Sequence, residues 1–268
     1  MTKEKTAGPV KLHHTLEGPQ DAPVLVFVNS IGTTYRMWDP QMPALKDRFR
    51  ILRYDQRGHG SSAVPDGPYS IPELGGDLLA LLDKLEIEAT SVCGLSLGGM
   101  VAMWVAAEAP ERIGRLALCC TSARLGPEET WKDRARIARA SGVKALTPAI
   151  LERWYTPAMQ KKNPEALEKT AAMLDGTPGE GYAGCCEAIR AMDLRGKLPA
   201  IAAPTLVVAG LEDPSTPPSM LRDIHSAVPD STLTIIPEAA HLANVEQPEA
   251  FNEALLSHLE PLTGGTPR

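Results

Sequence analysis

Residues 89–109 read ATSVCGLSLGGMVAMWVAAEA and combine a short apolar strand, a Gly-x-Ser-x-Gly turn and a helix that is apolar on nearly every side. Such a helix is predicted to be buried, and the turn places Ser96 at its N-terminus. The glycines at 94 and 98 permit a tight turn and close packing of strand against helix. In this strand–turn–helix context the serine of the pattern is a nucleophile. We therefore predict that role for Ser96 and an oxyanion-binding role for the backbone N–H of Leu97.

Short apolar runs of the same kind lie on both sides of this unit and are typical of strands buried in a parallel sheet. They cover residues 23–29, 49–55, 115–121, 204–210 and 232–238. Helical patterns lie between and after them, over residues 71–86, 217–228 and 248–260. The alternation predicts an α/β protein with a mostly parallel central sheet flanked by helices.

The alternation breaks at residues 122–197, which are helical, mixed in polarity and without a strand-like run. Because this stretch lies between two buried strands, we predict an insertion that forms a helical cap over the carboxyl edge of the sheet. The 268-residue chain is then a core of residues 1–121 and 198–268 with a cap of residues 122–197.

A serine hydroxyl needs a neighbouring base, and the base needs a carboxylate to orient it. His241 lies in the short loop EAAHLAN after the last predicted strand and is the predicted base. Asp213, in the loop GLEDPSTPP, is the predicted carboxylate, with the adjacent Glu212 as the alternative. His59 lies in the turn RGHGSS, where a structural role is predicted.

A second oxyanion donor is expected from the loop after the first buried strand. That loop is Asn29-Ser30-Ile31-Gly32-Thr33-Thr34, residues 29–34, and the backbone N–H of Ile31 is the predicted donor. A main-chain N–H does not depend on its own side chain, so the composition of this loop does not prevent the role. The alternative is a plain glycine-containing turn.

Together with RYDQRGHGSS at 53–62, these motifs resemble the α/β-hydrolase family across nearly the whole chain. The order Ser96, Asp213, His241 is the nucleophile–acid–base order of that fold. A narrower resemblance is to the 3-oxoadipate enol-lactonases. The segments that carry it are NSIGTTYRMWDPQ at 29–41, GLSLGGMVAMWVA at 94–106, LERWYTP at 151–157, GYAGCCEAIRAMDLR at 181–195, AGLEDPSTPP at 209–218 and AAHLANVEQPEAF at 239–251.

The resemblance implies a serine hydrolase of aromatic catabolism (the β-ketoadipate pathway) that opens 3-oxoadipate enol-lactone through an acyl-enzyme. It implies a small-molecule lactone as partner, and no metal or organic cofactor. Because this substrate carries a carboxylate, the pocket should supply a cation. We select Arg134 from the cap candidates Arg124, Lys132, Arg134, Arg153 and Arg190; a solvated surface charge is the alternative for each.

Trp131 and Trp154 are expected to form apolar walls of the substrate pocket, although they could equally pack the cap helices together. Cys185 and Cys186 are expected to act as small packing residues rather than as reactive thiols. Two other functions remain open. One is a carboxylesterase or cofactor-free perhydrolase of the same fold, and the other is a non-catalytic small-molecule receptor. A dehalogenase or epoxide hydrolase is disfavoured, because each needs a carboxylate where Ser96 stands.

Composition limits the possible partners. The net charge of −6 gives no general attraction to nucleic acid or to anionic lipid, and no apolar run is long enough for a transmembrane helix. Five cysteines without a Cys-x-x-Cys pattern, and an N-terminus without an apolar run, predict a cytoplasmic protein with reduced thiols. Nothing in the sequence selects an oligomeric state.

Overall fold

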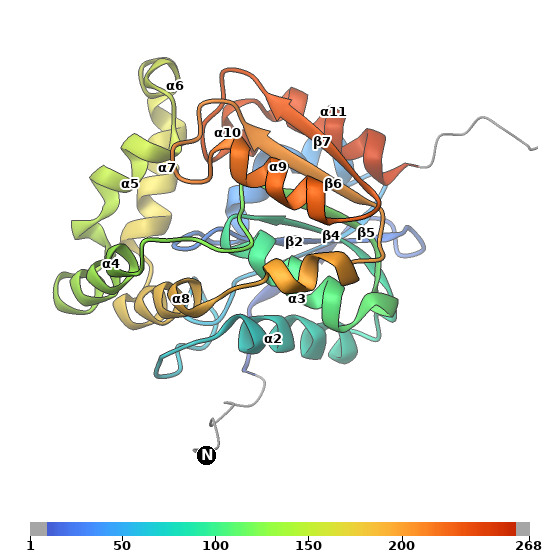
Figure 1. Ribbon diagram of the computed structural model, residues 1–268, viewed down its shortest axis with the longest axis horizontal. Coiled ribbons are helices and arrows are strands. Elements are labelled where there is room, and N and C mark those ends of the chain that lie inside the picture. Colours follow the sequence, from blue (N-terminus) through green and yellow to red (C-terminus); the bar gives the residue numbers. More distant parts are fainter. Residues whose placement is uncertain (1–9, 261–268) are drawn as a thin grey trace, which may run out of the picture.

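The six apolar runs predicted as strands pair, together with a short strand at His14–Glu17, into one seven-stranded sheet (Figure 1). The protein is described by a computed structural model over residues 10–260. The strands are β1 (His14–Glu17), β2 (Val24–Val28), β3 (Arg50–Tyr54), β4 (Thr90–Leu95), β5 (Ile113–Cys119), β6 (Thr205–Gly210) and β7 (Ser231–Ile236). Their order is β1-β3-β2-β4-β5-β6-β7, and only the β1–β3 pair is antiparallel. The predicted mostly parallel α/β fold is confirmed.

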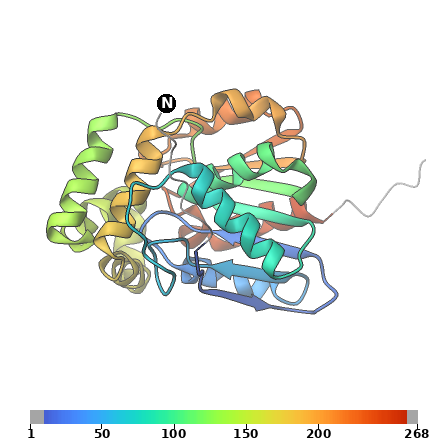
Figure 2. The same ribbon diagram turned by 90° about the horizontal axis from the view of Figure 1, so that it is seen from below.

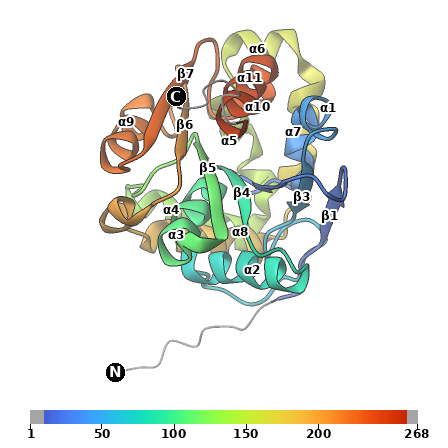
Figure 3. The ribbon, with the colours of Figure 1, turned by 90° about the vertical axis from the view of Figure 1, so that its right-hand side faces the viewer.

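Helices cover both faces of this sheet (Figure 3). On one face lie α2 (Ile71–Lys84), α3 (Leu97–Glu108) and α9 (Pro218–Ala227); on the other lie α1 (Met42–Leu45), α10 (Ala243–Glu246) and α11 (Pro248–Leu259). Short 3-10 turns cover Tyr35–Gln41, Pro110–Arg112, Val143–Ala145 and Arg195–Ala200. Because α3 packs between the sheet and α2, almost none of its surface is left for water, which explains its apolar sequence.

Parallel pairing aligns the carboxyl ends of the central strands. Val28, the last residue of β2, is paired with Gly94 of β4. Gly210, the last residue of β6, is paired with Ile236 of β7. The loops that follow these strands therefore meet along one edge of the sheet, which is the usual place for the site in folds of this kind.

Five further helices follow β5 and precede β6 in the chain. They are α4 (Glu128–Ser141), α5 (Thr147–Trp154), α6 (Pro157–Lys162), α7 (Pro164–Asp175) and α8 (Gly179–Ala191). They stand together beyond one end of the sheet, at the left of Figure 1 and again at the left of Figure 2. A Cβ on Gly181 of α8 would overlap the backbone of Gly58, so glycine at both places lets α8 approach the turn at residues 56–63. The division of the chain into a core and a cap at 122–197 stays a prediction.

The five cysteines are all buried, and none of them forms a disulfide. Burial raises the pKa of the thiols of Cys119, Cys120, Cys185 and Cys186. These groups are held as neutral thiols, which suits the packing role expected for the adjacent pair on α8.

Residues 10–260 contain no helix with both the length and the apolar character needed to cross a membrane. The same range holds no group of three or more His, Cys, Asp or Glu side chains placed to bind a metal ion. The predictions about cofactors, nucleic acid and compartment stay predictions.

Candidate active site

Ser96 occupies the sharp turn between the end of β4 and the start of α3. Its φ is 57° and its ψ is −116°, a conformation that is uncommon for a residue with a side chain. Three hydrogen bonds hold the peptide in this state, and one of them runs from the helical N–H of Met100 to the Ser96 carbonyl. The Ser96 N–H donates to the carbonyl of Cys119 over 2.9 Å, and the Ser96 carbonyl accepts from the Thr121 hydroxyl over 2.7 Å. The turn thus places the serine side chain at a helix N-terminus, the geometry that the sequence predicts for a nucleophile.

Two glycines make this turn possible, because they let three backbone segments touch. A Cβ on Gly94 would overlap the carbonyl of Gly98, and a Cβ on Gly98 would overlap the carbonyl of Val28. The Gly-x-Ser-x-Gly pattern is therefore a packing requirement of β2, β4 and α3 as well as a local turn signal.

His241 and Asp213 form a buried hydrogen-bonded pair, only 3% and 2% exposed. His241 Nδ1 lies 2.8 Å from Asp213 Oδ2, which also accepts from the Thr216 hydroxyl over 2.6 Å. The other carboxylate oxygen accepts from the N–H groups of Ser215 and Thr216. Burial raises the pKa of Asp213, but the charge of His241 and these hydrogen bonds outweigh it, so the pKa lies below its ordinary value. An ionised Asp213 holds the proton on Nδ1 and leaves Nε2 free to accept one.

The neighbouring Glu212 is exposed, and none of the hydrogen bonds found over residues 10–260 joins its carboxylate to His241. The structure thus brings Asp213, rather than Glu212, to the histidine. The turn at residues 213–216 holds this carboxylate in place, because the N–H groups of Ser215 and Thr216 both donate to it.

Ser96 and His241 line a common pocket of about 160 Å³. Trp131 and Arg134 of α4 and Trp154 of α5 line it as well, and the ring centroids of Trp154 and His241 are 5.6 Å apart. The remaining lining residues are Ile31, Leu125, Gly126, Pro127, Thr130, Arg153, Ser215 and Thr216. The side chains predicted to attack, to accept the proton and to hold substrate are therefore brought to one place, while their roles stay predictions.

No hydrogen bond between Ser96 Oγ and His241 is present in the range 10–260. In unliganded sites this contact is often long and tightens when a substrate is bound. Both residues nevertheless line the same pocket, which is consistent with a contact that forms when a substrate is bound.

The loop at residues 29–34 brings Ile31 to this pocket. The next N–H, that of Gly32, is already used, since it donates to His59 Nε2 over 2.8 Å. The N–H of Ile31 has no partner among the residues that the structure describes. The N–H of Leu97 is at the start of α3, where amides have no acceptor within the helix. Two free N–H groups beside the serine suit a developing oxyanion, and this role also stays a prediction.

His59 holds the loop at residues 29–34 through its hydrogen bond to Gly32. Its Nδ1 lies 3.1 Å from the carbonyl of Arg57, so Nδ1 carries the proton and Nε2 is the acceptor for Gly32. Burial lowers the pKa of His59, although the Arg57 carbonyl and Asp55 favour the charged form. The turn is itself anchored, because the buried Arg57 guanidinium pairs with Asp77 of α2 at 2.6 Å. The sequence indicates a structural role for His59, and its contact with the loop at residues 29–34 is the part that only the fold reveals.

We expect stability to fall as the pH drops below about 6.5, the ordinary pKa of histidine. Burial lowers the pKa of His59, so the unfolded chain binds a proton that the folded protein does not. The stabilisation is complete above the ordinary pKa and is lost as the pH falls toward the folded value, by at most about 1.4 kcal/mol per pH unit. Urea unfolding of the wild type and of His59→Gln over this range checks it.

The two proteins are compared by the slope of the free energy of unfolding against pH, because the substitution also changes the free energy of unfolding itself. Burial, with the charge of Arg115, lowers the pKa of His258 too, so His258→Gln is measured alongside to separate the two contributions. An unchanged pH slope in His59→Gln would contradict the assignment.

Only two of the five candidate cations line the pocket, Arg134 and Arg153. Neither makes an ion pair within residues 10–260. The Arg134 guanidinium lies 5.0 Å from the centroid of the Trp131 ring, and Arg153 donates to the carbonyl of Pro214 over 2.9 Å. Arg134 is half-buried and Arg153 is exposed, which favours Arg134 as the stronger anion anchor.

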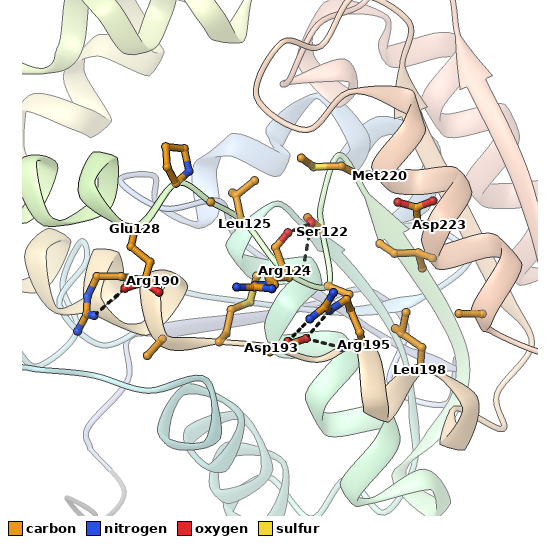
Figure 4. A pocket seen from close by; sticks show the side chains of 17 residues that line it. Ser122, Arg124, Leu125, Glu128, Arg190, Asp193, Arg195, Leu198, Met220 and Asp223 are labelled. Carbon is orange, nitrogen blue, oxygen red and sulfur yellow. Dashed lines mark hydrogen bonds and ion pairs between the residues drawn. The ribbon is translucent and has the colours of Figure 1, made fainter.

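The other three candidates point elsewhere. Lys132 pairs with Glu129 on the surface of α4. Arg124 and Arg190 line a separate pocket of about 720 Å³, which Figure 4 shows, and there Arg190 lies 3.6 Å from Glu128. The segment at residues 125–127 is common to both pockets and forms the wall between them.

The mostly parallel sheet and the serine in the sharp turn between β4 and α3 are together typical of the α/β hydrolases. The sequence pattern of the α/β hydrolase fold family matches residues 23–248, and the chain belongs to this family. Within it, the chain is 40% identical over 250 residues to 3-oxoadipate enol-lactonase 2 of Acinetobacter baylyi, covering 93% of each chain. The resemblance to the enol-lactonases predicted from the sequence is confirmed.

Solved structures give the same result. The enol-lactonase of Burkholderia xenovorans is 41% identical and superposes with a TM-score of 0.91, over 93% of this chain and 96% of that one. A hydrolase of Pseudomonas aeruginosa is 44% identical, also with a TM-score of 0.91, over 94% of this chain and 95% of that one.

Proposed function

We propose that this chain is a serine hydrolase that opens 3-oxoadipate enol-lactone to 3-oxoadipate. The single observation that carries the mechanism is the pocket that Ser96 and His241 share, with Asp213 hydrogen-bonded behind the histidine. The substrate class comes from the named relatives, which match this chain over nearly its whole length.

In this reaction Ser96 Oγ attacks the lactone carbonyl while His241 Nε2 takes the hydroxyl proton. The oxyanion is bound by the N–H groups of Ile31 and Leu97. Collapse of the tetrahedral intermediate breaks the ring C–O bond, and the protonated His241 gives its proton to the departing enol oxygen. The enol then tautomerises to the ketone. Water, activated by His241, releases the acid and restores Ser96.

The pocket also contains groups suited to the carboxylate of this substrate. Arg134 is a half-buried cation without an acidic partner among the described residues, and Trp131 and Trp154 give the pocket apolar walls. An arginine in such a place binds a carboxylate through charge-assisted hydrogen bonds. We propose that Arg134 anchors the substrate carboxylate.

Replacing Arg134 by glutamine should raise KM for the enol-lactone by roughly 10–100-fold, the effect of losing a hydrogen bond to a charged group. Hydrolysis of a neutral aryl ester should change by less than about threefold, because that substrate has no carboxylate to bind. The control is Arg136→Gln, on the same helix but exposed and paired with Asp133. Equal losses on both substrates would assign Arg134 to the pocket's structure instead.

The function itself is tested by following the ultraviolet absorbance of freshly prepared enol-lactone, with p-nitrophenyl acetate assayed beside it. We expect kcat/KM for the lactone to exceed that for the ester by at least about 100-fold. Rapid ester cleavage with slow lactone opening would overturn the proposal in favour of a carboxylesterase or perhydrolase. Binding of the lactone without turnover would favour a receptor.

We also propose that residues 122–197 act as the cap of a core formed by residues 1–121 and 198–268. Support comes from α4 and α5, which lie between β5 and β6 in the chain and supply Trp131, Arg134 and Trp154 to the pocket. A cytoplasmic location, proposed from the reduced cysteines, agrees with the five free thiols.

A further inference from the structure

The loop that carries His241 is hydrogen-bonded on both sides of the histidine. On one side, the N–H of Leu242 donates to the carbonyl of Trp154 over 3.2 Å. On the other, the N–H of Ala240 donates to Glu246 Oε2 over 2.9 Å. Trp154 is the last residue of α5, so one of these two bonds already ties the histidine loop to the helices between β5 and β6.

Glu246 extends the second bond to the same helices. Its other carboxylate oxygen, Oε1, accepts from the backbone N–H of Thr156 over 3.0 Å and from the Thr156 hydroxyl. Thr156 caps the N-terminus of α6 and lies 90 residues from Glu246 in the sequence. Figures 1 and 3 show α5 and α6 close to α10, on which Glu246 lies. One carboxylate therefore bridges the histidine loop and the junction between α5 and α6.

The burial of this carboxylate needs a reason. Glu246 is 8% exposed, and no Lys, Arg or His pairs with it within residues 10–260. A buried carboxylate without a counter-ion is costly unless hydrogen bonds satisfy it. Here all three donors are fixed by the backbone or held by the cap of α6, so the carboxylate is satisfied only while the loop and the helices keep their places.

We propose that Glu246 is a positioning residue for His241, which it holds at the pocket by bridging Ala240 to Thr156. The proposal rests on the proposed role of His241 as the base. Trp154 and Thr156 then contact the histidine loop at three points: the Leu242 bond, the Glu246 bridge and the Trp154 ring, which is tilted against the His241 ring with the centroids 5.6 Å apart. The segment 154–156 sets where the base stands.

The chemistry of the bridge requires a carboxylate at residue 246. Glutamine has nearly the same shape but only one acceptor oxygen, so its NH₂ group would face either the Ala240 N–H or the Thr156 donors. One donor would lose its partner, and the loop or the helix junction would have to move. A displacement of about 1 Å at a catalytic group can cost on the order of 100-fold in rate.

The experiment measures the rate at which a fluorophosphonate labels Ser96, together with kcat and KM for the enol-lactone. Labelling needs the serine and its base but no particular substrate, so it reports on positioning even where the lactone is not the substrate. We expect Glu246→Gln to slow labelling and kcat by roughly 10–100-fold, with KM changed by less than about threefold. The control is Glu249→Gln, an exposed residue at the start of α11.

Thermal unfolding accompanies each assay, so that rates are compared only where every variant is folded. A lower Tm with an unchanged labelling rate would show that Glu246 serves stability alone and would overturn the proposal. Wild-type labelling without lactone turnover would instead reject the proposed function and leave the labelling comparison decisive for Glu246.

A second pair of variants covers the case in which Glu246→Gln does not fold. Thr156→Val removes the hydroxyl donor, whereas Thr156→Ser keeps it. The serine variant should label several-fold faster than the valine variant. Equal rates for the two, both folded, would overturn the bridge.

Discussion

Replacing Ser96 by alanine should lower kcat for the enol-lactone by at least about 10³-fold while the fold survives. The side chain removed is the one at the strained turn between β4 and α3, with φ of 57°. Alanine accepts that backbone conformation no worse than serine does, because both carry a Cβ. The bonds that hold the turn come from the peptide and from Thr121, not from the serine hydroxyl.

The measurement is kcat for the purified variant beside fluorophosphonate labelling of the same preparation. Ser91→Ala, in the preceding strand β4, is the matched control and should keep wild-type turnover. Near-normal turnover in Ser96→Ala would reject the nucleophile assignment. A receptor on this scaffold would instead keep its ligand affinity in Ser96→Ala and would show no turnover in the wild type.

Replacing Asp213 by asparagine should lower kcat by roughly 10³–10⁴-fold. The carboxylate accepts from His241 Nδ1 at 2.8 Å, and its ionised form is favoured because its pKa lies below the ordinary value. An asparagine NH₂ in that place would favour the tautomer with the proton on Nε2, which is then unable to take the serine proton. It would also leave the imidazolium without its compensating charge.

Glu212→Gln tests the alternative carboxylate directly. Glu212 is exposed, and its carboxylate makes no hydrogen bond to His241 within residues 10–260, so its replacement should cost less than about threefold. A loss in Glu212→Gln as large as that in Asp213→Asn would transfer the acid role to Glu212. Circular dichroism of both variants confirms that the comparison is made on folded protein.

Several features of the fold could be predicted because they depend on the pattern of residues within one short segment. The run SVC before Ser96 and the apolar helix after it appear as β4 and α3, since both are buried and neither needs a distant residue to explain its pattern. The short elements α1 and α10 were not predicted, because four residues are too few to show a helical period.

The pocket side chains were predictable only in part. Arg134 and Arg124 look alike in the sequence, yet one lines the pocket with Ser96 and the other lines a separate pocket. Arg134 lies on α4 and Arg124 lies in the segment before it, so which of them faces the serine depends on where packing against α8 places α4, and helix packing of this kind is decided by contacts far apart in the chain. The hydrogen bonds of Thr216 to Asp213 and of Thr121 to Ser96 were missed, since a threonine that bonds such a residue has no sequence signature of its own.

The sequence by itself determined the strand–turn–helix at Ser96, the alternation that makes the sheet parallel, and the order of Ser96, Asp213 and His241 along the chain. These depend on backbone geometry and on periodicity, which short segments specify. Only the tertiary structure decided that Asp213 rather than Glu212 meets His241, that His59 holds Gly32, and that Glu246 joins Thr156 across 90 residues. Each of these is a hydrogen bond between distant segments, so its partner is chosen by the packing of the whole chain.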